Sequence, residues 1–206
     1  LHDFSLSLEK GQVYGLLGKN GAGKSTLLYL MSGLLTPKSG KVVYHDVDVR
    51  RRLPITLQDM FLVPEEFDLP PVSLISYIEL NSPFYPRFSK EDMVKYLHYF
   101  EMDINIDLGA LSMGQKKKVF MSFALATNTS LLLMDEPTNG LDIPLFKVIF
   151  CFCLMNRAKI QRLTWNYYLM LPWQFPKGFL HCSTLNKQNY DTRYFFQSNA
   201  FCESLP

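Results

Sequence analysis

Several features are missing or scarce in this sequence, and each one limits what the protein can be. No stretch reaches about 18 consecutive apolar residues, so the sequence offers no candidate for a membrane-spanning helix. The first residues lack the charged stretch, apolar run and small-residue cleavage site of a secretory signal. A net charge of only +2 over 206 residues predicts neither nucleic acid nor a membrane surface as a direct binding partner.

Cysteine and tryptophan are absent from residues 1–144, whereas residues 145–206 hold all four cysteines and both tryptophans. Acidic residues show the opposite distribution, because 17 of the 19 lie before residue 145. The four cysteines, at positions 151, 153, 182 and 202, are not spaced like the ligands of a zinc site. The composition thus divides the chain near Pro144 into an ordinary globular domain, residues 1–144, and an atypical tail.

A glycine-rich segment, residues 18–26, carries the pattern G-x-x-x-x-G-K-[ST] between an apolar strand-like run and a helical pattern. Glycines let backbone N–H groups turn around phosphate oxygens, and the helix N-terminus adds the positive end of its dipole. Lys24 would reach the β- and γ-phosphates, and the Ser25 hydroxyl would hold Mg²⁺. The residues of the predicted phosphate-binding loop are Gly18, Asn20, Gly21, Ala22, Gly23, Lys24, Ser25 and Thr26.

Two adjacent carboxylates, Asp135 and Glu136, follow the wholly apolar run at residues 131–134. Ligands of open α/β sheets bind at the carboxyl ends of the strands, so both side chains are expected beside the phosphate-binding loop. There Asp135 would hold Mg²⁺, and Glu136 would act as general base on the attacking water. The alternative interpretation is an ordinary acidic turn after a strand.

Four motifs in this order resemble those of the nucleotide-binding domain of ABC transporters. Residues 18–26 are similar to the Walker A loop, and residues 111–115, Leu-Ser-Met-Gly-Gln, to the signature motif. Residues 131–137 are similar to the Walker B strand, and residues 138–142 to the D-loop. The resemblance covers residue 1 to about residue 144. It implies an α/β fold of the P-loop NTPase class, a bacterial type of ATP-binding subunit, and ATP and Mg²⁺ as ligands.

The resemblance also implies partners. Two such domains pair head to tail in the family, so Ser112, Gly114 and Gln115 of one domain would contact the nucleotide held by the other. Asn139 and Asp142 would lie at the interface of that dimer. ATP hydrolysis would drive a separate transmembrane permease, which would place the chain in the cytoplasm, peripheral to the inner face of the cell membrane.

The expected core is a mostly parallel sheet around the strand at residues 13–17. Alternation of apolar and polar side chains at residues 4–8 predicts a half-buried strand at an antiparallel edge near the N-terminus. Further strands are predicted at residues 41–44, 47–49, 59–63 and 131–134.

Helical patterns dominate residues 65–115, which we expect to form a helical subdomain beside the sheet. Ser89 is the expected N-cap of one of its helices, because two acidic residues follow in the first turn. Ser112 is the expected N-cap of a helix that continues to Ala126.

The sequence departs from the family at three positions of this domain. Met113 replaces a glycine of the signature motif, for which we expect a modest effect. Glu65 stands where the family has a glutamine that contacts the nucleotide site, although Gln58 is a second candidate for that role. The aromatic residue that stacks on adenine would lie upstream of Leu1, and Tyr14 is a poor substitute for it, so we expect native sequence before Leu1.

The tail departs further. The family's switch histidine has no clear counterpart, since residues 165–172 contain no histidine and His181 follows only a weak strand-like run. No helical or alternating period persists in residues 145–206, so we expect them to add no recognisable core strand. Our hypothesis is that the reading frame shifts near Pro144 or that the tail is disordered; the other two frames of the coding DNA would test the first possibility.

Two other functions stay open beside a transporter ATPase. One is a nucleotide-binding remnant without efficient turnover, which the missing switch histidine favours. The other is a soluble ABC-type ATPase that acts on ribosomes or DNA, for which a second ATPase domain or a long basic coiled coil would be typical. The sequence shows neither of those two features.

Overall fold

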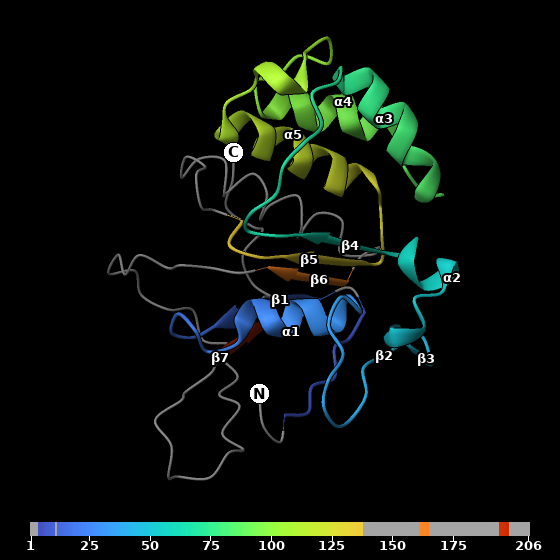
Figure 1. Cartoon of the computed structure of the whole chain (residues 1–206), viewed down its shortest axis with the longest axis vertical. Helices are drawn as coiled ribbons and strands as arrows, with labels where there is room; N and C mark the ends of the chain where they lie inside the picture. Colours follow the sequence, from blue (N-terminus) through green and yellow to red (C-terminus); the bar gives the residue numbers. More distant parts are fainter. Residues whose placement is uncertain (1–3, 11, 138–160, 165–193, 198–206) are drawn as a thin grey trace.

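The computed structural model describes residues 4–10, 12–137, 161–164 and 194–197, with only the backbone described for Val13, Leu17 and the last two ranges. A five-stranded sheet crosses the middle of the molecule in the order β4-β5-β6-β1-β7 (Figure 1). Its strands are β1 (Val13–Leu17), β4 (Met60–Val63), β5 (Leu131–Met134), β6 (Gln161–Thr164) and β7 (Tyr194–Gln197). A separate antiparallel pair consists of β2 (Val43–Tyr44) and β3 (Val47–Asp48).

Helices lie on both faces of the sheet. The α-helices are α1 (Lys24–Met31), α2 (Pro54–Leu57), α3 (Leu74–Asn81), α4 (Lys90–Tyr99) and α5 (Met113–Ala126). Short 3₁₀ turns cover Val49–Arg51, Ser82–Phe84 and Leu108–Ala110. Figure 1 shows α1 on one side of the sheet and α3, α4 and α5 on the other. No helix within the described ranges is both long enough and apolar enough to cross a membrane.

The strands β4, β5, β6 and β1 run parallel, so their carboxyl ends lie at one edge of the sheet. Strand β7 pairs antiparallel with β1 and forms the far edge. The loop after β1, the loop after β4 and the loop after β5 therefore all leave the sheet at the same edge. This topology decides where the charged residues that follow those strands meet.

Alternate side chains of β4 and β5 enter two different cores, as the period of two in a strand requires. Leu132 and Met134 of β5 pack with the helices α3, α4 and α5, whereas Leu131 and Leu133 pack with α1. All four side chains of β5 are buried. A strand covered on both faces reads as a continuous apolar run, which is why residues 131–134 show no alternation.

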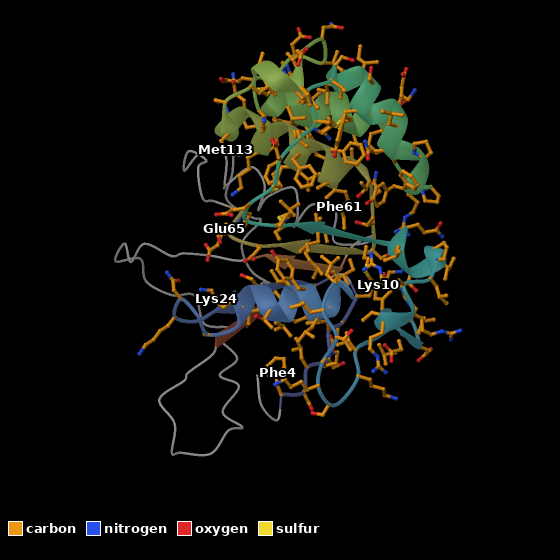
Figure 2. All side chains as sticks on the ribbon, in the orientation of Figure 1. Phe4, Lys10, Lys24, Phe61, Glu65 and Met113 are labelled. Carbon is orange, nitrogen blue, oxygen red and sulfur yellow. The ribbon has the colours of Figure 1, made fainter. Side chains whose placement is uncertain are left out.

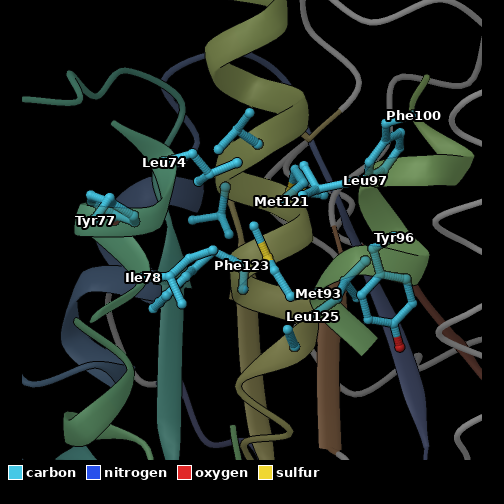
Figure 3. Packing of buried hydrophobic residues seen from close by; sticks show 14 of the residues in the cluster. Leu74, Tyr77, Ile78, Met93, Tyr96, Leu97, Phe100, Met121, Phe123 and Leu125 are labelled. Carbon is cyan, nitrogen blue, oxygen red and sulfur yellow. The ribbon is translucent and has the colours of Figure 1, made fainter. Parts of the chain in front are cut away.

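Helix α5 is the centre of the helical layer. Side chains of α3 and α4 converge on it from opposite sides (Figure 3). Phe123 on α5 is 1% exposed, and its ring lies 5.3 Å from that of Tyr77 and 5.1 Å from that of Phe88. The ring of Phe61 on β4 lies 6.1 Å away, so the same side chain joins the helical layer to the sheet.

Asp59, just before β4, ties three segments together through its carboxylate. It accepts hydrogen bonds from the Tyr44 hydroxyl at 2.7 Å and from the backbone N–H of Ser130 at 3.1 Å. It also pairs with the guanidinium of Arg87, which precedes α4. The β2–β3 pair, the start of β5 and the helical layer are thus connected at the end of the sheet opposite the strand carboxyl ends.

Most elements predicted from the sequence are confirmed, but the expected strand at residues 4–8 is wrong. Residues 4–9 form no strand: Phe4 and Leu8 pack against the core beside α1, and the backbone N–H of Glu9 donates to the Tyr14 hydroxyl at 2.8 Å. The antiparallel edge of the main sheet is β7, from the far end of the chain. The short strands expected near residues 41–44 and 47–49 form the β2–β3 pair.

The expectation that the tail adds no core strand is also wrong. Strand β6 lies between β5 and β1, where Leu163 is paired with Leu133 on one side and Tyr14 on the other. The remaining tail residues, including His181 and the four cysteines, lie outside the described residues. A shift of the reading frame near Pro144, and the boundary of the first domain there, stay predictions.

Replacing Phe123 with alanine should lower the free energy of unfolding by about 3–5 kcal/mol, because the change leaves a cavity where four aromatic rings meet between the sheet and the helices. Urea unfolding followed by circular dichroism measures this loss. Phe84→Ala is the matched control: Phe84 is 68% exposed, so its loss should stay within about 0.5 kcal/mol. Equal losses in the two variants would contradict the described core.

Replacing Leu163 with proline should destabilise the protein by about 3 kcal/mol or more, because proline cannot donate a ladder hydrogen bond inside a strand paired on both sides. The thermal unfolding midpoint of the full chain measures the effect. An unchanged midpoint would show that residues 161–164 are not part of the sheet, as a frameshifted or disordered tail would require.

Candidate functional site

The loop between β1 and α1 has the shape that an anion site requires. Gly21 and Gly23 have φ values of +80° and +87°, which favour glycine strongly over other residues. Gly23 is the N-cap of α1, and no side chain caps this helix end. The backbone N–H groups and the positive end of the helix dipole therefore face the loop, where phosphate oxygens would bind.

Lys24 connects the loop to the end of β5. Its Nζ donates hydrogen bonds to the main-chain oxygen of Gly18 at 3.1 Å and to Asn20 Oδ1 at 3.4 Å. The same Nζ lies 3.8 Å from Glu136 Oε1, and the two side chains are only 10% and 12% exposed. The structure thus brings the predicted phosphate-binding lysine and the predicted general base into one place. Of the other predicted loop residues, Ser25 is half-buried and Thr26 is exposed.

Asp135 is buried at the carboxyl end of β5, with 1% of its surface exposed. Burial raises the pKa of its carboxyl group, and a hydrogen bond from the Ser25 hydroxyl acts in the opposite direction. Asp135 Oδ1 has no hydrogen-bond partner among the described residues. A buried carboxylate oxygen without a partner is costly, and a cation bound there would remove that cost.

The donor set fits Mg²⁺. This ion is usually held by one or two carboxylates together with phosphate oxygens of the substrate, rather than by a complete cage of side chains. Ser25 and Asp135 supply such a partial set. Within the described part of the chain, no three histidine, cysteine, aspartate or glutamate side chains cluster as ligands of a metal ion. The site therefore suits an ion that arrives with a phosphate ligand.

Glu136 has an unusual backbone. Its φ is +44°, a left-handed conformation that is uncommon for a residue other than glycine and is frequent at functional sites. Burial raises the pKa of its carboxyl group, and Lys24 acts in the opposite direction. A carboxylate with a raised pKa, partly shielded from water, is suited to accept a proton from a water molecule.

Lys117 belongs to the site, although the sequence analysis did not identify it. Its side chain is 4% exposed, and its Nζ donates a hydrogen bond to the main-chain oxygen of Glu136 at 2.9 Å. A signal was present in the sequence: Lys117, Met121 and Leu125 follow at intervals of four residues and share the buried face of α5. The run of three lysines at 116–118 had the appearance of an exposed surface.

Glu65 follows β4 by two residues and is exposed at the carboxyl edge of the sheet, between the start of α5 and Lys24 (Figure 2). Its charge contributes to raising the pKa of both Asp135 and Glu136. Gln58 precedes β4 and so lies at the other end of this strand. The structure therefore favours Glu65 over Gln58, which is half-buried, as the residue at the glutamine position.

The signature residues lie at the exposed start of α5. Ser112 and Gln115 form a capping box at the start of α5, in which each side chain accepts a hydrogen bond from the other residue's backbone N–H. Both residues are exposed, Met113 is 61% exposed and Gly114 is partly exposed. Their contact with a nucleotide in a partner domain stays a prediction, and Asn139 and Asp142 lie outside the described residues.

Comparison with known proteins agrees with this geometry. The family model described as ABC transporter matches residues 1–139. The ABC transporter ATP-binding protein YtrB of Bacillus subtilis is 28% identical over 142 residues, which are 69% of this chain and 49% of that protein. The Nod factor export ATP-binding protein I of Cupriavidus metallidurans is 33% identical, over 68% of this chain and 48% of that protein. The chain spans about half the length of these curated relatives.

Solved structures show the same architecture. An ABC transporter cassette in its ADP conformation is 29% identical with a TM-score of 0.58, covering 81% of this chain and 74% of that one. A dimeric bacterial ABC transporter cassette is 25% identical with a TM-score of 0.65, covering 78% and 76%. Since the family model matches well over half of the residues, this chain belongs to the ABC transporter family, and the matching part is the family's ATP-binding cassette.

Proposed function

We propose that this chain is the ATP-binding subunit of an ABC transporter, which binds and hydrolyses ATP to drive a separate transmembrane permease. The observation that carries the proposal is the meeting of Lys24, Asp135 and Glu136 at one edge of the sheet. A lysine, a buried carboxylate with an unsatisfied oxygen and a second carboxylate with a raised pKa are the groups that ATP hydrolysis needs.

Each of these residues has a separate task. The N–H groups of the loop and of the start of α1 hold the phosphates, and Lys24 places its positive charge beside the β- and γ-phosphates. Ser25 and Asp135 would hold Mg²⁺, which neutralises developing negative charge when it is bound. Glu136 accepts the proton of the attacking water, and its distance of 3.8 Å from Lys24 Nζ supports a position beside the γ-phosphate.

The partners follow from the exposed start of α5 and from the relatives. We propose a head-to-tail dimer in which Ser112, Gly114 and Gln115 close over the nucleotide of the partner subunit. The exposure of Ser112 and Gln115 supports this, as does the dimeric cassette among the similar structures. The names of the relatives include a Nod factor export protein and a phosphonates import protein, which supports coupling to a permease at the inner face of the membrane.

A second candidate function is nucleotide binding without efficient turnover. Glu65 favours it, because an ionised carboxylate accepts hydrogen bonds but cannot donate one, and because its charge repels the γ-phosphate. Comparing the affinity for ATP with the turnover rate distinguishes this candidate from an active ATPase.

Lys24→Ala should weaken ATP binding severely, because this side chain supplies the cation that the structure places between the loop and Glu136. Equilibrium titration with a fluorescent ATP analogue and Mg²⁺ measures the affinity. Lys19→Ala is the matched control: the same charge is removed from an exposed position of the same loop, so the affinity should change by less than about threefold. An unchanged affinity in Lys24→Ala would refute the site.

Glu136→Gln should keep ATP binding and lower kcat by about 10²–10⁴-fold, because the amide keeps the shape of the side chain but cannot accept the proton. Phosphate release under saturating ATP measures the rate. Glu66→Gln removes a nearby exposed carboxylate and should leave kcat within about twofold. If Glu136→Gln hydrolyses ATP at the wild-type rate, Glu136 is only a turn residue.

A further inference from the structure

The first turn of α5 directs one lysine into the site and another toward an exposed carboxylate. Lys116, whose side chain is 17% exposed, pairs through Nζ with Asp68 at 2.8 Å, and the Asp68 side chain is 82% exposed. Lys117, the next residue, is 4% exposed and reaches the main-chain oxygen of Glu136 at 2.9 Å. These two neighbouring lysines carry the same charge and lie in the same helical turn, but only one of them is buried beside the predicted general base.

Burying an ammonium group is unfavourable unless negative charge or hydrogen-bond acceptors surround it. Burial lowers the pKa of Lys117, and the carboxylates of Glu65, Glu136 and Asp135 act in the opposite direction. These three carboxylates follow the paired strands β4 and β5 at one edge of the sheet, where Val63 is paired with Met134, so that Glu65 and Glu136 each stand two residues beyond the last pair. The buried ammonium group is therefore held in place by the same charges that the predicted chemistry uses.

The hydrogen bond from Lys117 acts on a strained part of the chain. Glu136 adopts φ +44°, a strained conformation that persists only when surrounding contacts hold it. Its main-chain oxygen is fixed by Lys117 Nζ, and its side chain lies near Lys24 Nζ. The peptide and the carboxylate of Glu136 are thus held by two different lysines from two different helices.

We propose that Lys117 is a positioning residue of the site: it holds the main chain of Glu136 in its left-handed conformation and balances the additional negative charge that Glu65 brings. This inference rests on the proposed ATP hydrolysis for its kinetic consequence. It concerns an interaction between residues of this chain, however, and that interaction exists without nucleotide. The proposal predicts that the effects of Lys117 and Glu65 on stability are coupled. Removing the charge of Glu65 should therefore reduce the loss of stability caused by replacing Lys117.

A double-mutant cycle without nucleotide tests the coupling in the full chain. Thermal unfolding is measured for the wild type, Lys117→Met, Glu65→Gln and the double variant. Lys117→Met should lower the midpoint by roughly 5 °C, since it removes the hydrogen bond to the main-chain oxygen of Glu136 and one of the two cations near the carboxylates. The loss should be clearly smaller when Glu65 is already glutamine. Equal losses in both backgrounds would overturn the charge-balancing part of the proposal.

The kinetic arm tests positioning. Lys117→Met should lower kcat by about tenfold or more while KM for ATP changes by less than about threefold, because misplacing a reacting group affects the chemical step more than binding. Lys117→Arg, which keeps the charge and a donor, should recover most of kcat. Adding Glu65→Gln to Lys117→Met should recover part of it. An unchanged kcat in Lys117→Met would overturn the positioning role.

Lys116→Met is the matched control, because it removes the same charge one residue earlier and breaks only an ion pair with an exposed partner. Its kcat should stay within about twofold of the wild type. A loss in Lys116→Met equal to that in Lys117→Met would show a general effect of charge on α5 and would overturn the proposal. If the wild type binds no nucleotide, the proposed function fails, while the nucleotide-free cycle still decides whether Lys117 and Glu65 are coupled.

Discussion

The parallel pairing of β1, β4, β5 and β6 is the constraint on which the site depends, because it places the carboxyl ends of these strands at one edge. The loop after β1 provides Lys24, the segment after β4 provides Glu65, and β5 leads directly into Asp135 and Glu136. The pairing of the strands is enough to bring these four residues together, and no direct contact among their side chains is required for it. The cost of the arrangement is electrostatic, since three carboxylates gather near the buried Lys117 and the half-buried Lys24.

Helix α5, in the helical layer, offsets this electrostatic cost by supplying a positive charge. Its C-terminal half is buried among the side chains of α3 and α4, with Phe123 reaching the sheet, so the helix has a fixed position relative to β5 (Figure 3). Its first turn then delivers Lys117 to the peptide of Glu136. Apolar packing at one end of the helix thus decides where a positive charge lies at the other end.

The sequence predicts the parts of this structure whose signals are local. The glycine-rich loop, the helix after it, the apolar strands at 59–63 and 131–134 and the cap at Ser112 all depend on residues within a few positions of one another, and the structure confirms them. The strand expected at residues 4–8 fails for the opposite reason. Alternation permits a strand there, but a strand also requires a neighbouring strand, and the described part of this segment packs Phe4 and Leu8 against the core without joining a sheet.

Strand β6 and Lys117 were missed because their roles are set by distant residues. Four residues of β6 show no period of their own, yet β1 and β5 leave one position between them, and β6 fills it. Lys117 looks like its neighbours Lys116 and Lys118 in the sequence, and only the packing of α5 decides which of the three points inward. The helical period of its buried face was the one usable signal.

The difference between features set by neighbouring residues and features set by distant ones also bears on whether such a chain is an ATPase or only binds nucleotide. Binding depends mainly on the loop and helix after β1, which form one local unit with its own glycines and lysine. In the proposed mechanism, turnover depends in addition on the orientation of Glu136, whose strained main chain accepts a hydrogen bond from Lys117 on α5. A cassette can therefore lose turnover while it keeps its affinity for nucleotide, through changes that never touch the phosphate-binding loop. Glu65 adds negative charge near Glu136, and Lys117, in the first turn of α5, offsets that charge. Changes in this turn are therefore expected to affect turnover more than nucleotide binding.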